Sequence, residues 1–230
     1  MAYVKQQAAA PLRADARRNR EQIIEAARAM FLREGTDVPM EEIARAAGVG
    51  IGTLYRRFPD RGELIKAVSL DNLERMNELA ARLEREEPDP AAALEALLRA
   101  VRDQYLGIVL TSAAAMAFRA AGDLPAIEER RDELLGVIDR LLHRAQEQGA
   151  VRRDIRAGDV LLMLVAVSRM LPAGGDGLGA MVFERLFALM LDGFRPRAES
   201  PLPGRPVGYD DVEHLRRHGI IAGLGRAAER

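Results

Sequence analysis

Residues 40–58 read MEEIARAAGVGIGTLYRRF, and their pattern of apolar residues and glycines indicates how the first part of the chain folds. Apolar residues recur at helical spacing from Met40 to Ala47, and two glycines, Gly48 and Gly50, then break the pattern. A second short helix is expected from Ile51 to Phe58, because Pro59 ends it. Two short helices joined by a glycine-containing turn are the pattern of a helix-turn-helix, so the sequence predicts that motif here.

The second of these helices is expected to have two different faces. At about 100° per residue, apolar side chains gather on one side and polar or small residues on the other. The apolar side consists of Ile51, Leu54, Tyr55 and Phe58, and the outer side of Gly52, Thr53, Arg56 and Arg57. Arginine is suited to guanine or phosphate, threonine to a base edge, and glycine permits a close approach. The outer side therefore suits a groove of double-stranded DNA, although an ordinary solvated face is the alternative.

The segments that flank the motif are also expected to be helical. A first helix is predicted from Ala16 to Glu34, and Asp60 and Glu63 have the spacing of a capping box, which predicts a long helix from Arg61. Residues 1–15 are expected to be a flexible basic arm. Residues 1–20 hold Lys5, Arg13, Arg17, Arg18 and Arg20 against a single acidic residue, Asp15. This local charge, with Arg17 as a DNA-contacting candidate, is expected to lie near a phosphate backbone.

The composition restricts the function classes that remain. Of 230 residues, 48% are hydrophobic and only 4% aromatic, and the net charge is −1, which favours an all-α protein with a local rather than a global basic patch. The absence of cysteine excludes disulfides and cysteine-ligated metals. Three scattered histidines do not form a metal or triad site, so no cofactor and no enzymatic activity are expected. No signal region or membrane-length apolar run is visible, so we expect a cytoplasmic protein without membrane contact.

The rest of the chain predicts a helical domain over residues 62–195 and a Pro-rich linker and tail over 196–230. Helices are expected at about 91–110, 112–121, 125–148, 159–171 and 179–191. The last two are apolar on nearly every side, and one protomer of this size can hardly cover both. We therefore expect a homodimer, in which these helices pair with their counterparts as a four-helix bundle across a two-fold axis. One large monomeric core is the alternative.

A cavity for a small-molecule effector is expected among the middle helices. Methionine and aromatic residues suit adaptable apolar sites, although the same residues are also ordinary core residues. The candidates are Leu97, Val101, Tyr105, Met116, Phe118 and Met163. Little in this set anchors a charge, so an apolar or aromatic molecule is favoured.

The stretch from Ile23 to Val68 resembles the DNA-binding domain of TetR-family transcriptional regulators. The pieces Glu-Glu-Ile-Ala, Ala-Gly-Val, Gly-Thr-Leu-Tyr and Phe-x-x-(basic)-x-x-Leu occur in order and with the family's spacing. This specific resemblance covers about the first third of the chain. The later helices are similar to the family's divergent regulatory domain in length and number only.

The resemblance implies roles for individual residues. It places Gly52, Thr53 and Arg56 at positions that face bases in the family. It places Tyr55 and Arg57 at positions that contact phosphate. These expectations rest on the family's motif, residue by residue, and not on composition or spacing.

Three positions around the motif depart from the family's pattern or extend it. Arg61 stands where the family often has a phosphate-binding lysine. Gly50 stands where the family usually has a serine N-cap, a change that costs only a few tenths of a kcal/mol. Ile51 replaces a frequent polar or basic residue, and either packs or contacts a thymine methyl group.

The resemblance also implies a function. Residues 16–61 are expected to be a helix-turn-helix domain, and the dimer is expected to bind a palindromic operator of double-stranded DNA as a repressor. An effector would release it by tilting the long helix from Arg61 to Arg85. The alternative is a helical small-molecule-binding or protein-interaction module whose helix-turn-helix does not bind DNA.

Overall fold

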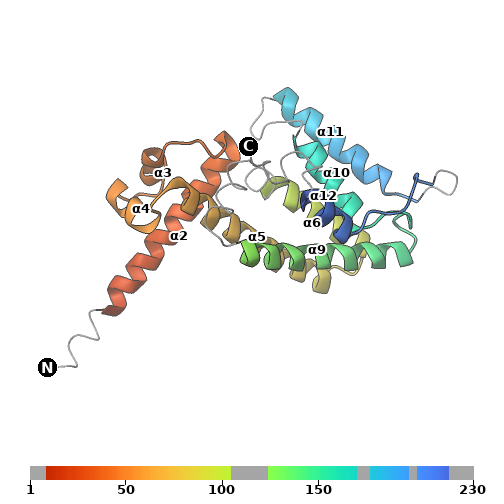
Figure 1. Ribbon diagram of the computed structural model, residues 1–230, viewed down its shortest axis with the longest axis horizontal. Coiled ribbons are helices and arrows are strands. Elements are labelled where there is room, and N and C mark those ends of the chain that lie inside the picture. The colour runs from red at the N-terminus through yellow and green to blue at the C-terminus, as the bar shows by residue number, and fades with distance from the viewer. Residues whose placement is uncertain (1–8, 105–123, 170–176, 197–200, 218–230) are drawn as a thin grey trace.

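The computed structural model describes residues 9–104, 124–169, 177–196 and 201–217. These residues contain helices and no strand, so the predicted all-α class is confirmed (Figure 1). The helices are α2 (Ala9–Glu34), α3 (Met40–Ala46), α4 (Ile51–Arg57), α5 (Arg61–Glu86), α6 (Pro90–Gln104), α9 (Leu124–Glu147), α10 (Ala157–Arg169), α11 (Gly177–Gly193) and α12 (Tyr209–Arg217). The helix expected at 112–121 lies outside the described residues.

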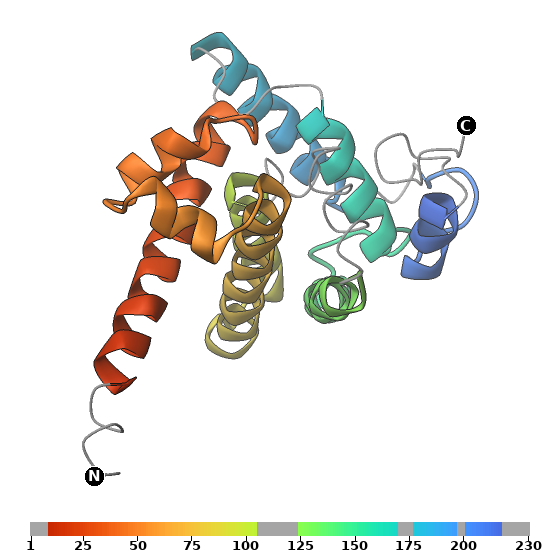
Figure 2. The same ribbon diagram turned by 60° about the vertical axis from the view of Figure 1, so that its left-hand side comes forward.

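The helices form two groups joined by α5. Helices α2, α3 and α4 pack together at one end of the molecule, and α6, α9, α10, α11 and α12 lie at the other (Figure 1). α5 contacts α2 at one end and α6 and α9 at the other. In the turned view α10 lies between α11 and α12 (Figure 2). One continuous helix therefore belongs to both the helix-turn-helix unit and the larger helical unit.

The first helix begins earlier than the sequence predicted. α2 starts at Ala9 instead of Ala16, so residues 9–15 of the expected arm are helical. This segment is rich in alanine, the best helix former, and proline is tolerated in a first turn, where Pro11 stands. The prediction was wrong because it relied on apolar periodicity, which this segment lacks.

The N-terminal group is held together by a small apolar core. Each of its three helices, and the start of α5, contributes at least one side chain that is fully buried: Ile23, Phe31, Ile43, Leu54 and Leu64. Full burial of such a side chain contributes about 1.5–3 kcal/mol. Because Leu54 is the buried residue of α4, this core decides which side of α4 faces outward.

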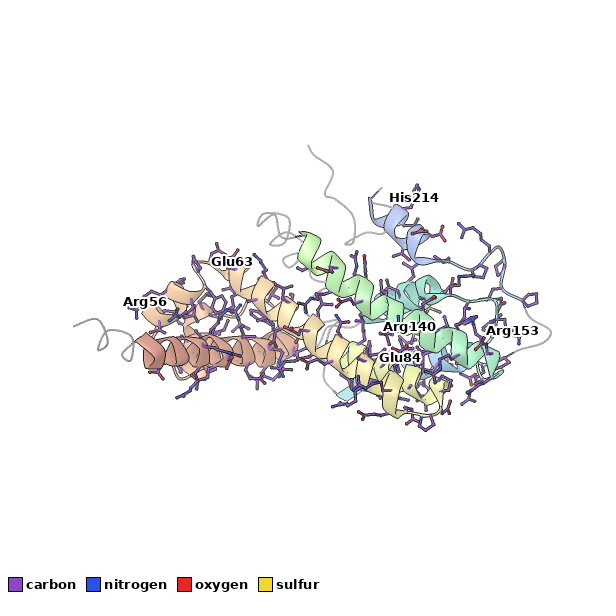
Figure 3. All side chains as sticks on the ribbon, turned by 90° about the horizontal axis from the view of Figure 1, so that it is seen from below. Arg56, Glu63, Glu84, Arg140, Arg153 and His214 are labelled. Atoms are coloured by element: carbon purple, nitrogen blue, oxygen red, sulfur yellow. The ribbon has the colours of Figure 1, made fainter. Side chains whose placement is uncertain are left out.

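Polar contacts stabilise α5 near both of its ends. α5 begins at Arg61, as the capping box predicted, with the Asp60 side chain accepting a hydrogen bond from the Glu63 N–H at 2.9 Å. Near the other end of α5, Arg140 of α9 donates to both carboxylate oxygens of Glu84, at 2.7 and 2.9 Å. Glu84 and Arg140 are labelled where α5 and α9 lie side by side (Figure 3).

The described C-terminal residues do not form the free linker that the sequence predicted. α12 contacts α10, and Val212 of α12 is buried. Prolines at 201, 203 and 206 suggested a linker, but they precede a segment that docks on the body of the domain. None of the described helices is both long and apolar enough to cross a membrane.

We predict that Glu84→Gln lowers the free energy of unfolding by less than about 1 kcal/mol near neutral pH, because a partly exposed ion pair contributes little. Hydrogen bonding from Arg140 lowers the pKa of the Glu84 carboxyl. The contribution is therefore present above the carboxyl's ordinary pKa and is lost as the pH falls through the lowered value.

Urea unfolding at neutral and strongly acidic pH measures this contribution. The double variant Glu84→Gln with Arg140→Gln serves as control, since it should lose little more than either single variant. An equal loss of stability at both pH values would contradict the role given to the carboxylate.

Candidate nucleic-acid interface

The turn between α3 and α4 is set by Gly48. Its φ of +67° lies in the left-handed region, where a side chain is strained. The Gly48 N–H donates to the Arg45 carbonyl at 3.1 Å, and the Val49 N–H donates to the Ala44 carbonyl at 3.0 Å. These two bonds form a Schellman motif, which ends α3. The turn therefore fixes the direction in which α4 leaves α3.

α4 starts at a glycine N-cap. The Gly50 carbonyl accepts the Thr53 N–H at 2.8 Å and the Leu54 N–H at 3.1 Å, and no side chain caps the helix. A Cβ atom built at Gly50 or at Gly52 would meet nothing within 4 Å. At Gly50 and Gly52 the backbone is therefore accessible and carries no side chain, which permits close approach by a partner.

The outward face of α4 carries the residues that the sequence placed there. Gly52, Arg56 and Arg57 are exposed and Thr53 is partly exposed. The expected apolar face is only half buried. Leu54 and Phe58 are buried, whereas Ile51 and Tyr55 are 39% and 44% exposed. A helix of seven residues touches its neighbours along a narrow strip, so the apolar residues beside that strip stay on the surface.

The two arginines on the outer face of α4 differ from Arg17 of α2 in their ion pairing. Arg56 donates to the Thr53 hydroxyl oxygen at 3.3 Å, and no described carboxylate lies within ion-pair distance of Arg56 or Arg57. Arg17, by contrast, pairs with Glu21 at 2.8 Å. Arg56 is labelled near the end of the molecule that holds α4 (Figure 3). The geometry leaves both α4 guanidiniums available to an anionic partner.

Arg20 is an additional basic residue at this surface that the sequence analysis did not single out. Its guanidinium carbon lies 5.6 Å from the centroid of the Phe58 ring, so an exposed cation sits beside the C-terminal end of α4. In the sequence, Arg20 was noted only as part of the positive charge of residues 1–20. A contact between α2 and the residue after α4 leaves no local pattern that would reveal it.

Arg61 has an internal role that the sequence did not predict. Its Nη1 donates to the carbonyls of Thr36 (2.7 Å) and Val38, two buried residues of the loop between α2 and α3. Buried backbone carbonyls outside helices and strands have no regular partner and need hydrogen-bond donors. This guanidinium therefore joins the start of α5 to that loop, and the phosphate contact expected of Arg61 stays a prediction.

The expected effector residues are not brought together in the described part of the chain. Leu97 and Val101 are buried in the core, but Met163 is 48% exposed on α10, so it does not share an interior site with them. Met163 was included among the candidates because methionine suits adaptable apolar sites. The remaining candidates, Tyr105, Met116 and Phe118, lie outside the described residues.

Cavities elsewhere in the described residues include the following two. One of about 540 Å³ lies between α6 and α11, and Leu94, Arg99 and Arg185 are among its lining residues. Another of about 910 Å³ lies between α9, α10 and the C-terminal segment. No group of three or more histidine or carboxylate residues in the described ranges is placed to hold a metal ion.

The comparisons with known proteins agree with this geometry. Residues 23–68 match the family model described as bacterial regulatory proteins, tetR family, and residues 89–196 match that of the SbtR-like transcriptional regulator C-terminal domain. A TetR transcriptional regulator from Streptomyces coelicolor is 34% identical in sequence. It superimposes with a TM-score of 0.60, over 78% of this chain and 99% of that protein.

Two further similarities are more limited. An HTH-type transcriptional regulator from Staphylococcus aureus is 44% identical over 54 residues, which are 23% of this chain and 29% of that relative. The TetR-like regulator LfrR from Mycobacterium smegmatis, solved in complex with proflavine, is 21% identical and shares the fold. Its TM-score is 0.56 over 79% of this chain and 98% of that protein.

We predict that Arg61→Gln lowers the free energy of unfolding by about 1–3 kcal/mol, because it leaves two part-buried carbonyls without their charged donor. Urea unfolding followed by circular dichroism measures the change. Arg57→Gln is the matched control, since Arg57 is exposed and should change stability by no more than about 0.5 kcal/mol. Equal stability of the two variants would refute the internal role of Arg61.

Proposed function

The chain belongs to the TetR family of bacterial transcriptional regulators, and on that premise we propose that it is a repressor that binds a palindromic operator as a homodimer and leaves it when a small effector binds. Members of this family are DNA-binding transcription factors and not enzymes. Such a regulator acts in the cytoplasm, where the DNA is.

One observation carries the DNA-binding part of the proposal. The outer face of α4 combines an exposed glycine, a partly exposed threonine and two arginines without carboxylate partners among the described residues. An α-helix fits the major groove, where arginine reads guanine and threonine contacts a base edge. We assign Gly52, Thr53 and Arg56 to base contacts, and Tyr55 and Arg57 to phosphate contacts.

The dimer is supported by apolar residues that one protomer leaves uncovered. On α10 and α11 the large apolar residues Met163, Leu178, Met181 and Leu189 are between 48% and 65% exposed. Large apolar side chains that stay exposed on neighbouring helices are a mark of association sites. A two-fold axis at these helices gives two copies of α4, and two copies read two symmetric half-sites, which is why the operator is palindromic.

The effector part of the proposal rests on α5. This helix starts in the helix-turn-helix unit and ends against α6 and α9. A shift of its C-terminal end would therefore move the helix-turn-helix unit, including α4. We propose an apolar or aromatic effector that binds among the middle helices. LfrR, the fold relative from Mycobacterium smegmatis, binds the small molecule proflavine in its solved complex.

Selection of bound duplexes from a random pool tests the function directly. The proposal predicts enrichment of a palindrome with two half-sites. If no sequence is enriched even at low salt, the alternative holds, and the chain is a small-molecule-binding or protein-interaction module without DNA binding.

We predict that Arg56→Ala and Arg57→Ala weaken DNA binding in different ways. Arg56→Ala should relax the preference at one position of each half-site, at a cost of about 1–3 kcal/mol. Arg57→Ala should weaken binding to all sequences alike and reduce the slope of log K against log salt by about 0.9 per protomer. Fluorescence anisotropy across salt concentrations measures both, and identical behaviour of the two variants would overturn the assignment.

We predict that Leu189→Glu converts the dimer to a monomer at micromolar concentration, because it places a charge in an interface that excludes water. Sedimentation velocity measures the change. Gln148→Glu introduces the same residue at an exposed position in the turn after α9 and should leave the dimer intact. A wild-type monomer, or a dimeric Leu189→Glu variant, would rule out this interface.

A further inference from the structure

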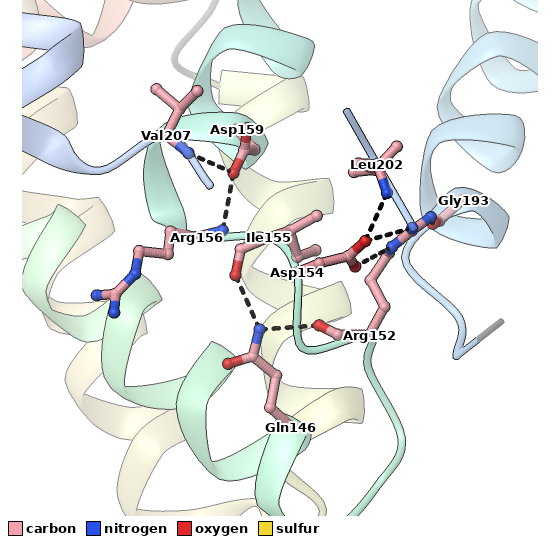
Figure 4. A network of polar contacts seen from close by, with 9 residues as sticks. All are labelled: Gln146, Arg152, Asp154, Ile155, Arg156, Asp159, Gly193, Leu202 and Val207. Atoms are coloured by element: carbon pink, nitrogen blue, oxygen red, sulfur yellow. Dashed lines mark hydrogen bonds and ion pairs between the residues drawn. The ribbon is translucent and has the colours of Figure 1, made fainter. Parts of the chain in front are cut away.

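The C-terminal segment 201–217 docks on the corner where the chain passes from α9 into α10. This segment lies beyond residue 196, where the match to the family's C-terminal domain ends. Figure 4 shows Leu202 and Val207 of the segment bonded to the residues of the corner. The segment is thus an addition to the family domain with a defined place on it.

The closest approach involves two backbones. A Cβ atom built at Gly158, in the first turn of α10, would lie 2.4 Å from the Val207 carbonyl oxygen and 2.6 Å from that of Gly208. Backbone atoms do not yield as the end of a flexible side chain does. Glycine inside a helix is less stable than alanine by up to about 1 kcal/mol, so docking supplies a physical reason for its presence at position 158.

Two carboxylates of the corner hold the backbone of the segment. Asp159 accepts the Val207 N–H at 3.0 Å and also the Arg156 N–H at 2.9 Å, so one side chain caps α10 and binds the segment. Asp154 accepts the Leu202 N–H at 2.8 Å. Backbone N–H groups of extended segments need such acceptors.

The corner is itself tied to the end of α11. The Arg152 N–H donates to the Phe194 carbonyl at 2.9 Å, and its guanidinium donates to both oxygens of Asp154. The same guanidinium reaches the Gly193 carbonyl at 3.4 Å (Figure 4). A shift of the segment is therefore transmitted to both α10 and α11.

The segment has internal structure that keeps it in shape. Arg205 donates to both carboxylate oxygens of Asp211, at 2.7 and 2.5 Å, and Asp211 accepts the Gly208 N–H at 2.9 Å. The pKa of Asp211 is held well below its usual range, chiefly by the Arg205 hydrogen bonds. Val212 belongs to α12, its side chain is buried, and α12 contacts α10.

We propose that residues 152–159 form a docking surface whose occupant is the chain's own segment 201–217, and that the docked segment fixes α10 for association with a second copy. α10 lies between α12 and α11, and α10 and α11 carry the exposed apolar residues of the proposed interface. The docking itself is independent of the proposed function, whereas its effect on association rests on the proposed dimer.

Amide hydrogen exchange on the full chain, followed by sedimentation, tests both parts. Gly158→Ala should raise the exchange of the Leu202 and Val207 amides at least about tenfold and weaken the dimer by a similar factor. Val207→Pro removes the N–H that Asp159 accepts, lies outside the helices, and should weaken the dimer likewise even if Gly158→Ala fails to fold. Gly193→Ala is the control, since a Cβ there meets nothing within 4 Å.

The exchange data test the docking, and the sedimentation data test its coupling to association. Unprotected amides in the wild-type segment, or unchanged exchange in Gly158→Ala, would overturn the docking. Faster exchange with an unchanged dimer dissociation constant in both variants would overturn the coupling to association. A monomeric wild-type protein would defeat the proposed dimer and with it the coupling, while the exchange data would still decide whether the segment docks.

Discussion

Leu54 and Phe58 are buried where α4 packs on α2 and α3, and this packing determines the geometry of the candidate interface. A seven-residue helix has too few residues to be stable alone, so packing on one side is what makes α4 a helix. Because one side of α4 is packed, its opposite side faces solvent or a binding partner. The left-handed backbone of Gly48 then sets the direction in which this side points.

The connection between the two halves is made by one helix that belongs to both. α5 is at once the last helix of the N-terminal core and a layer of the larger domain. Arg61 attaches its first residue to the loop before α3, and Glu84 attaches its last turn to α9. Because α5 packs into both units, it is the element through which the proposed effector response would pass.

The sequence predicted local features well and distant contacts poorly. The capping box at Asp60, the glycine turn at Gly48 and the outer face of α4 depend on residues within one or two turns of each other, so spacing reveals them. The partners of Arg61 and the approach of Val207 to Gly158 join positions far apart in the chain, and no local pattern encodes them. The exposure of Met163 could not be predicted either, since a helix that is apolar on nearly every side does not reveal which side a neighbour covers.

We propose that the outer face of α4 enters a groove of double-stranded DNA. Nuclear magnetic resonance mapping of backbone amides during titration with a duplex at low salt measures this contact. We expect the amides of Gly52, Thr53 and Arg56 to shift most, while those of α10 and α11 stay unchanged. Unchanged α4 amides beside a saturable response elsewhere in the chain would contradict it.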